Sequence, residues 1–370
     1  MSGQTFYKDK PYVFVPLAES VARSAPKGHD SALSRACGVL HITIQAKTPL
    51  HFGQGLLEMD MQQSVIRALH VLGRESDGNE MRIALPGSSF KGMLRAFFEV
   101  VTDSCVLIPP RRLLEALPYG NRVVCRHKDG LCPACSVFGS LGYRGKLSFT
   151  SFLAEENAKT KERVLPQLQA PFRDYPRENR GMGNERLYYG DFQDLHGTEI
   201  GNLTKEEFFR RKRDKRGRQI QFYGRKFYKH ARKQAEGRDV LGSSYECLTE
   251  GSLLKGEIRY QGLTEQELGS LMFALGMGWS VPIYHKLGYA KPAYFGSVKL
   301  SVEAEALPDR YRGMGLCHDT AGLKTLAETY RSRVSEDALL AIQRLEEAWS
   351  SLEGPFQWKH PAEGGQNLVY

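Results

Sequence analysis

Apolar and polar residues alternate along several short stretches of this chain, which is the pattern of β-strands that bury one face. The alternation predicts strands at 39–46, 146–152, 253–260 and 297–302. Apolar residues at helical spacing predict helices at 94–101 and 264–275, and Thr264 with Glu267 forms the signature of a capping box at the start of the second helix. Strands that alternate with helices in this order indicate an α+β fold of the ferredoxin-like kind.

The polar stretches between these elements divide the chain. We expect an N-terminal arm at 1–30, an α+β core at 31–310 and a C-terminal helical extension at 311–370. The helix of the extension, at 338–352, is expected to lie outside the core. Three loops interrupt the core: a hairpin or loop at 50–84, a cysteine-bearing loop at 105–135 and a long basic insertion at 155–245.

A candidate anion site lies in the motif Leu-Pro-Gly-Ser-Ser-Phe-Lys-Gly-Met-Leu-Arg. Ser88 or Ser89 can cap the helix that follows, and Gly87 lets a ligand come close to the backbone. Lys91 and Arg95 lie one helical turn apart, near the unpaired amides of the first turn, so the motif suits a phosphate group. An ordinary capped amphipathic helix with a few basic residues would have the same sequence pattern. The motif therefore supports an anion site only together with the neighbouring features of the chain.

Positive charge is concentrated in one segment. The 370 residues carry a formal net charge of +9, and residues 205–233 alone hold 13 Lys and Arg against 3 acidic residues. Aromatic residues are interspersed among these cations at Phe208, Phe209, Phe222, Tyr223, Phe227 and Tyr228. Cations that contact phosphates and rings that stack on bases together indicate a nucleic-acid surface. A solvated basic loop is the alternative, but such a loop gains nothing from exposed rings.

Composition excludes several classes of protein. The hydrophobic share of 41% and the charged share of 25% are typical of a globular protein. No apolar run approaches the roughly 20 residues of a membrane helix, and the N-terminus has no signal-peptide core. Seven cysteines without an export signal indicate a reducing compartment rather than a disulfide framework. We therefore expect a cytoplasmic protein that does not engage a membrane.

Three thiols and an imidazole occur close together, at Cys125, His127, Cys132 and Cys135. The Cys-x-x-Cys pair supplies two ligands for tetrahedral zinc, and Cys125 with His127 would complete a Cys₃His site. Cys105 is an alternative fourth ligand. Four protein ligands leave no open position for a catalytic water, so the Zn²⁺ would be structural and would fold the loop around it. Reduced cysteines in a loop are the plain alternative.

Several short motifs resemble, in their order and spacing, those of CRISPR-associated RAMP superfamily proteins, in particular the backbone subunits of type III effector complexes. They are Pro-Tyr-Val-Phe-Val-Pro-Leu at 11–17, Ala-Lys-Thr-Pro-Leu-His-Phe-Gly at 46–53, Leu-Pro-Gly-Ser-Ser-Phe-Lys-Gly at 85–92, Cys-Pro-Ala-Cys-Ser-Val-Phe-Gly at 132–139, Gly-Arg-Lys-Phe-Tyr at 224–228, Leu-Thr-Glu-Gln-Glu-Leu-Gly at 263–269 and His-Lys-Leu-Gly-Tyr-Ala-Lys-Pro at 285–292. The resemblance runs nearly end to end. It implies an RRM-like core that binds guide RNA, positions target RNA and contacts other type III effector subunits.

Three of these motifs contain the candidate RNA contacts: Gly87, Ser88, Ser89, Lys91, Arg95, Arg225, Lys226, His285, Lys286, Gly288 and Lys291. In the last motif, backbone amides and cations around Gly288 could bind successive phosphates. Tyr289 beside it could stack on a base. A tight turn that closes the edge of the sheet would also explain Gly288.

The resemblance raises the question of catalysis. Backbone subunits of this kind often cut target RNA with an aspartate in the loop before the Gly-Ser-Ser helix, and Asp60 lies in the corresponding loop. Asp60 could hold a divalent cation such as Mg²⁺ near the scissile phosphate, and a solvated carboxylate is the alternative. A stand-alone endoribonuclease that trims repeat RNA would instead need a histidine-led acid–base pair, for which the N-terminal region offers His29, His41 and His51.

Overall fold

The central strands form where apolar and polar residues alternate. In β2 (Ala36–Ala46), Leu40, Ile42 and Ile44 are buried, and the residues between them point to the opposite face. The computed structural model of the chain describes residues 12–15, 17–26, 36–59, 66–70, 72–74, 81–106, 125–126, 128–164, 225–232, 234, 244–304 and 318–346.

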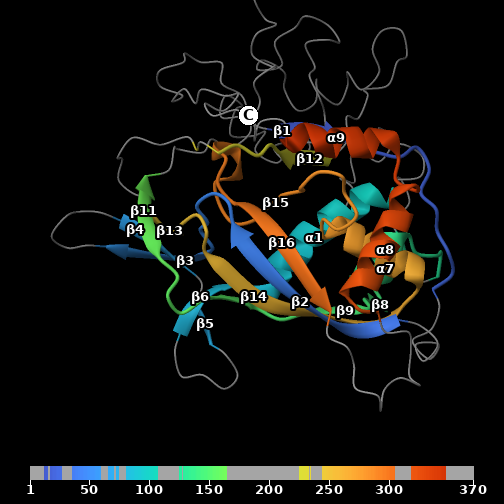
Figure 1. Cartoon of the computed structure of the whole chain (residues 1–370), viewed down its shortest axis with the longest axis horizontal. Coiled ribbons are helices and arrows are strands. Elements are labelled where there is room, and N and C mark those ends of the chain that lie inside the picture. The colour runs from blue at the N-terminus through green and yellow to red at the C-terminus, as the bar shows by residue number, and fades with distance from the viewer. Residues whose placement is uncertain are drawn as a thin grey trace, which may run out of the picture.

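An eight-stranded antiparallel sheet forms the centre of the fold (Figure 1). Its order is β15-β16-β2-β14-β10-β6-β5, and β9 (Leu147–Phe149) also pairs with β14. The other strands of this sheet are β5 (Leu72–Arg74), β6 (Met81–Leu85), β10 (Phe152–Ala154), β14 (Leu253–Leu263), β15 (His285–Lys286) and β16 (Ser297–Ala304). Since helices cover this sheet, the predicted α+β class is confirmed.

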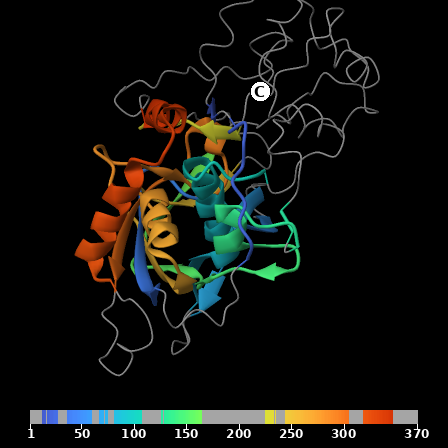
Figure 2. The same ribbon diagram turned by 90° about the vertical axis from the view of Figure 1, so that its right-hand side faces the viewer.

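Two helices pack side by side on one face of the sheet, α1 (Gly87–Val101) and α7 (Glu265–Ala274) (Figure 2). The predicted capping box of α7 is confirmed, because the Thr264 hydroxyl accepts a hydrogen bond from the Glu267 amide at 3.2 Å and the Glu267 carboxylate accepts one from the Thr264 amide at 3.0 Å. Sequence patterns missed α8 (Thr320–Arg331), which packs on α7, and α3 (Pro133–Phe138).

The opposite face of the sheet carries paired charges. On this face Lys255 contacts Glu155 at 3.1 Å, and Glu257 lies 3.0 Å from Arg259 and 3.8 Å from His41. These charges alternate with the buried residues of β2 and β14, as the pleat of a strand requires. The face is therefore polar and, within the described strands, close to balanced in charge.

Smaller sheets flank the centre. One has the order β11-β13-β4-β3, and another pairs β1 with β12. Their strands, with those of the short hairpin β7-β8, are β1 (Tyr12–Val15), β3 (Gly53–Met59), β4 (Ile66–His70), β7 (Gly139–Ser140), β8 (Tyr143–Arg144), β11 (Thr160–Val164), β12 (Arg225–Tyr228) and β13 (Ser244–Leu248). Figure 1 shows β3 extending away from the central sheet.

Two local predictions are wrong. The single strand expected at 146–152 is divided into β9 and β10, because the Thr150 hydroxyl takes the place of a carbonyl and accepts a hydrogen bond from the Glu257 amide at 2.8 Å. Neither Ser88 nor Ser89 caps α1: Pro86 is the N-cap residue, and no side chain caps the helix. Gly87 instead lets the first turn approach the chain between β9 and β10, where a Cβ atom would clash with the Thr150 carbonyl oxygen.

The C-terminal helix is part of the core, so its predicted place outside the core is wrong. Helix α9 (Glu336–Glu346) buries Ala338, Ala341 and Ile342 in the main apolar cluster. It lies against β1 and α1 (Figure 1). Its apolar residues recur at helical spacing and bury one stripe of the helix, whereas Leu340 remains half exposed.

None of the helices in the described ranges is both long and apolar enough to cross a lipid bilayer.

Candidate nucleic-acid cavity and metal centre

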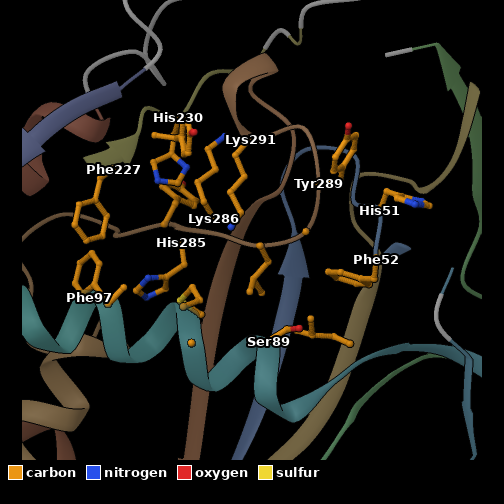
Figure 3. A pocket seen from close by; sticks show the side chains of 18 of the residues that line it. His51, Phe52, Ser89, Phe97, Phe227, His230, His285, Lys286, Tyr289 and Lys291 are labelled. Atoms are coloured by element: carbon orange, nitrogen blue, oxygen red, sulfur yellow. The ribbon is translucent and has the colours of Figure 1, made fainter. Parts of the chain in front are cut away.

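A cavity of about 900 Å³ lies between α1, the loop after β15 and strand β12. Figure 3 shows Ser89 and Phe97 on α1, with His285, Lys286 and Lys291 above them and Tyr289, His51 and Phe52 at one side. The cavity brings together seven of the predicted RNA contacts, which come from all three motifs: Ser88, Ser89, Lys226, His285, Lys286, Gly288 and Lys291. The remaining four, Gly87, Lys91, Arg95 and Arg225, do not line it.

The loop that forms one side of the cavity is held close to the segment before β3. Gly288 adopts φ of +75°, and a Cβ atom there would lie 2.5 Å from the carbonyl oxygen of His51. The amide of Tyr289 donates a hydrogen bond to the same oxygen at 3.0 Å. The expected tight turn at Gly288 is therefore present. Gly288 also lines the cavity, so the turn does not exclude a ligand contact.

One wall of the cavity contains the polar residues His230, His285 and Lys286, and the Glu346 carboxylate lies 3.8 Å from His230. The Lys286 ammonium donates a hydrogen bond to the carbonyl of Phe295 at 3.0 Å. Burial lowers the pKa of His285 to about 4 and holds the pKa of Lys286 well below its usual range. Burial raises the pKa of Glu346 to about 8. Each shift disfavours the charged form, so this wall is less polar than its residue types suggest.

Lys291 differs from Lys286 in its contacts. Burial lowers the pKa of Lys291, and the positive charge of Lys291 in turn contributes to the lowered pKa of Lys286. In the portion of the chain that the structure describes, the ammonium of Lys291 has neither an ion pair nor a hydrogen bond. A partly buried cation without a counter-charge is a natural partner for a phosphate.

Arg95 and Arg225 are held by protein groups. The Arg95 guanidinium donates hydrogen bonds to the Glu99 carboxylate at 2.9 Å, to the Gly139 carbonyl at 2.7 Å and to the sulfur of Cys135 at 3.3 Å. Arg225 lies 3.5 Å from Glu99 and donates hydrogen bonds to the carbonyl groups of Ser104 and Cys105. Both arginines lie beside the cysteines, and the hydrogen bonds of both guanidinium groups go to protein atoms there rather than to the cavity.

Lys91, on the first turns of α1, is half-buried outside the cavity lining. Its pKa is lowered, first by burial and then by the positive charge of Arg95. The two cations of the Gly-Ser-Ser helix thus interact unfavourably with each other, but their surroundings differ. Lys91 remains available to an anion at the surface, whereas Arg95 has its donors occupied.

Four cysteines meet in the core: Cys105, Cys125, Cys132 and Cys135. Their sulfur atoms all lie within 4.8 Å of one another, and Cys105 is 3.5 Å from Cys132, 3.6 Å from Cys125 and 3.8 Å from Cys135. Ligands of a tetrahedral ion with metal–sulfur bonds of about 2.3 Å would be about 3.8 Å apart. The residues therefore fit a structural metal ion, with Cys105 as the fourth thiol. His127, the other candidate, lies outside the described residues.

Local structure explains how the cysteines meet. Cys132 is the N-cap of α3 and Cys135 lies in its first turn, while Cys105 follows the end of α1. All four are nearly inaccessible to solvent and belong to the main apolar cluster. Hydrogen bonding within the cluster lowers the pKa of the Cys125 thiol and raises that of Cys105. Thiolate is the form that binds a metal.

Sequence reasoning missed several cavity residues, and three of them lie in segments that we interpreted differently. His230 and Tyr245 lie in the segment that we interpreted as an insertion, where no periodic pattern marked them. Leu345 of α9 reaches the cavity from a helix expected to lie elsewhere. Asp60, the candidate catalytic residue, follows the end of β3 outside the described residues.

The comparison with known protein families identifies a family for most of the chain. The model of the RAMP superfamily matches residues 43–281, well over half of the chain, and this range contains the cysteine cluster and most of the cavity lining. The chain therefore belongs to the RAMP superfamily. Membership makes it a CRISPR-associated protein with an RNA-binding function, whose partners are CRISPR RNA and Cas proteins. No curated protein sequence matches the chain.

Proposed function

We propose that this chain is a subunit of a type III CRISPR effector complex that binds guide RNA at the cavity and positions complementary target RNA. The observation that carries the proposal is the convergence of Ser89, Lys226 and Lys291 on one cavity of a RAMP superfamily chain. Lys291 has no counter-charge within the described residues, and cations of this kind supply most of the affinity for a phosphate backbone.

We propose further that the core is RRM-like. The chain order β2, α1, β10, β14, α7, β16 and the sheet order β16-β2-β14-β10 support this, since they match the ferredoxin-like arrangement. RRM domains commonly stack bases on the open face of the sheet. The outward positions of β2, β14 and β16 contain no Phe, Tyr or Trp and carry paired charges, which favours RNA contact on the helical side.

We propose Zn²⁺ as the metal of the cysteine cluster. Four thiolates in tetrahedral spacing are typical of structural zinc, and a set without an open position supplies no catalytic water. The Arg95 and Arg225 contacts tie this cluster to α1 and β12, both of which line the cavity. Zinc would thus stabilise α1 and β12, the elements that carry several of the proposed RNA contacts.

Replacing Lys226 and Lys291 together by alanine should weaken guide RNA binding about tenfold at physiological salt, because each lost phosphate contact removes counterion release. The plot of log K against log salt should become shallower by about one for each lysine. Filter binding with the purified full-length chain at several salt concentrations measures both. Lys255→Ala with Arg259→Ala, on the opposite face of the sheet, is the matched control. Equal affinity of all three proteins would refute the proposal.

Cleavage is a second candidate function, in two versions. Asp60 could hold Mg²⁺ for target cleavage within the complex. Alternatively, the isolated chain could cut repeat RNA, and the position of His51 favours this version. Its Nδ1 lies 2.7 Å from the carbonyl oxygen of Glu246, which fixes the ring and makes Nε2 the acceptor nitrogen, as a general base requires.

One cleavage assay separates these versions. Asp60→Asn should abolish target cutting by the guide-loaded complex and leave binding unchanged, if the first is correct. His51→Asn should abolish cutting of repeat RNA by the isolated chain, if the second is correct, while His41→Asn on the opposite face should not. Absence of any cutting by the unmodified protein in both assays would leave the chain a binding subunit.

A further inference from the structure

A pair of stacked tyrosine rings stands at the side of the cavity. Tyr245 of β13 and Tyr289 of the loop after Gly288 have ring centroids 5.2 Å apart and planes inclined by 21°. His51 meets the Tyr245 ring edge-on at 5.1 Å. Burial, followed by the interaction with the Tyr289 side chain, raises the pKa of Tyr245 to about 12. The two rings therefore form one fixed aromatic surface.

One face of this surface remains open. Tyr289 is 43% exposed although its ring stacks on Tyr245, and it is among the few large apolar side chains that the described residues leave exposed. Figure 3 shows Tyr289 and Phe52 on the same side of the cavity, across from Lys286 and Lys291. A planar ligand can stack on such a ring without displacing any protein contact.

The backbone that presents Tyr289 and Lys291 is strained. Ala290 and Tyr294 adopt φ of +54° and +66°, and among the described residues only Asp103 shares this left-handed conformation without being glycine. Non-glycine residues in this region cost free energy and occur often at ligand sites. Here the strained positions flank Lys291, which begins a short 3₁₀-helix at Lys291–Ala293. The loop therefore holds its ring and its cation in a defined relation.

We propose that the cavity holds a single unpaired nucleotide of the bound RNA, with the base against Tyr289 and the adjoining phosphate at Lys291. This inference rests on the proposed RNA-binding function and names the unit that the site accepts. A cavity of about 900 Å³ is of the size that accommodates one small-molecule ligand and is too small for a base-paired helix. Aromatic rings stack on bases of any identity, so the site accepts an unstacked base without reading its sequence.

The test compares Tyr289→Leu with Tyr289→Phe in the full-length chain, with single-stranded RNA of mixed sequence as the probe. Removing the ring should weaken binding by roughly 5- to 100-fold, and the phenylalanine variant should bind nearly as well as the parent. The slope of log K against log salt should stay the same in both variants, because no phosphate contact is lost. A blunt RNA duplex should not compete for the site.

A second readout places the base. RNA that carries one 4-thiouridine should form a photochemical crosslink to Tyr289 or Tyr245, detected by mass spectrometry of the digested protein. If Tyr289→Leu binds as the parent does and no such crosslink forms, while the paired lysine variant is weakened, the nucleotide site is refuted and the RNA-binding function stands. If single-stranded RNA does not bind the parent chain at all, both are refuted.

Discussion

Replacing Cys105 by serine is expected to abolish metal binding and to lower the melting temperature by roughly 10 °C or more. The thiol is central to the cluster, with the other three sulfur atoms between 3.5 and 3.8 Å away. Structural zinc contributes many kcal/mol to folding, and a domain of this size loses about 2–4 °C for each kcal/mol. Metal analysis of the purified protein should find one zinc per parent chain and none in the variant.

Two controls sharpen this result. Cys37→Ser changes a half-buried thiol of β2 outside the cluster and should retain zinc. His127→Ala should also retain it, because the four thiols complete a tetrahedral set without an imidazole. Loss of zinc from His127→Ala with retention in Cys105→Ser would instead assign the fourth position to the histidine. If the purified parent protein contains no zinc, the proposal of a zinc centre is refuted.

Arg225→Ala should destabilise the fold by about 3 kcal/mol or more, because it leaves the buried Glu99 carboxylate with one partner fewer and two carbonyl groups without their donor. The Arg225 and Glu99 side chains are only 9% and 10% exposed, and Arg225 donates to the carbonyls of Ser104 and Cys105. Urea denaturation followed by circular dichroism measures the change in free energy of unfolding.

The neighbouring residue supplies the control. Lys226 lies next to Arg225 in β12, but its ammonium lies over the rings of Tyr12 and Tyr228 and its side chain lines the cavity. Lys226→Ala should therefore reduce RNA affinity and change the free energy of unfolding by less than about 1 kcal/mol. Equal stability of Arg225→Ala and the parent would show that the buried network does not hold the cluster in place.

Alternation and capping chemistry were sufficient to predict the centre of the fold. Local signals specify the strands β2, β14 and β16, because each buries one face in the core. A local signal also specifies the start of α7, because its capping box lies within four consecutive residues. The boundaries of β9 and β10 could not be predicted in this way. Their break depends on a contact between Thr150 and Glu257, which lie 107 residues apart.

The same distinction applies to the site. Residue type and motif placed His285, Gly288 and Lys291 together, because they lie within one short loop, and all three line the cavity. Their contact with RNA stays a prediction. The sequence alone could not show that Arg225 is buried whereas Lys226 lines the cavity. Adjacent side chains of a strand point to opposite faces, but no strand was predicted at this position. The sequence left Cys105 and His127 as alternatives for the fourth ligand. Cys105 is far from the other cysteines in sequence, and only the fold brings its thiol to theirs.

Helix α9 supplies Leu345 to the cavity and lies on β1, and β1 pairs with the cavity-lining strand β12, so segments from near the two ends of the chain support one side of the cavity. Pairing between segments so distant in sequence slows folding. The side of the cavity that Leu345 completes exists only after translation has passed through α9. Under the proposed function, a protein truncated before α9 should therefore bind guide RNA more weakly than the full-length chain.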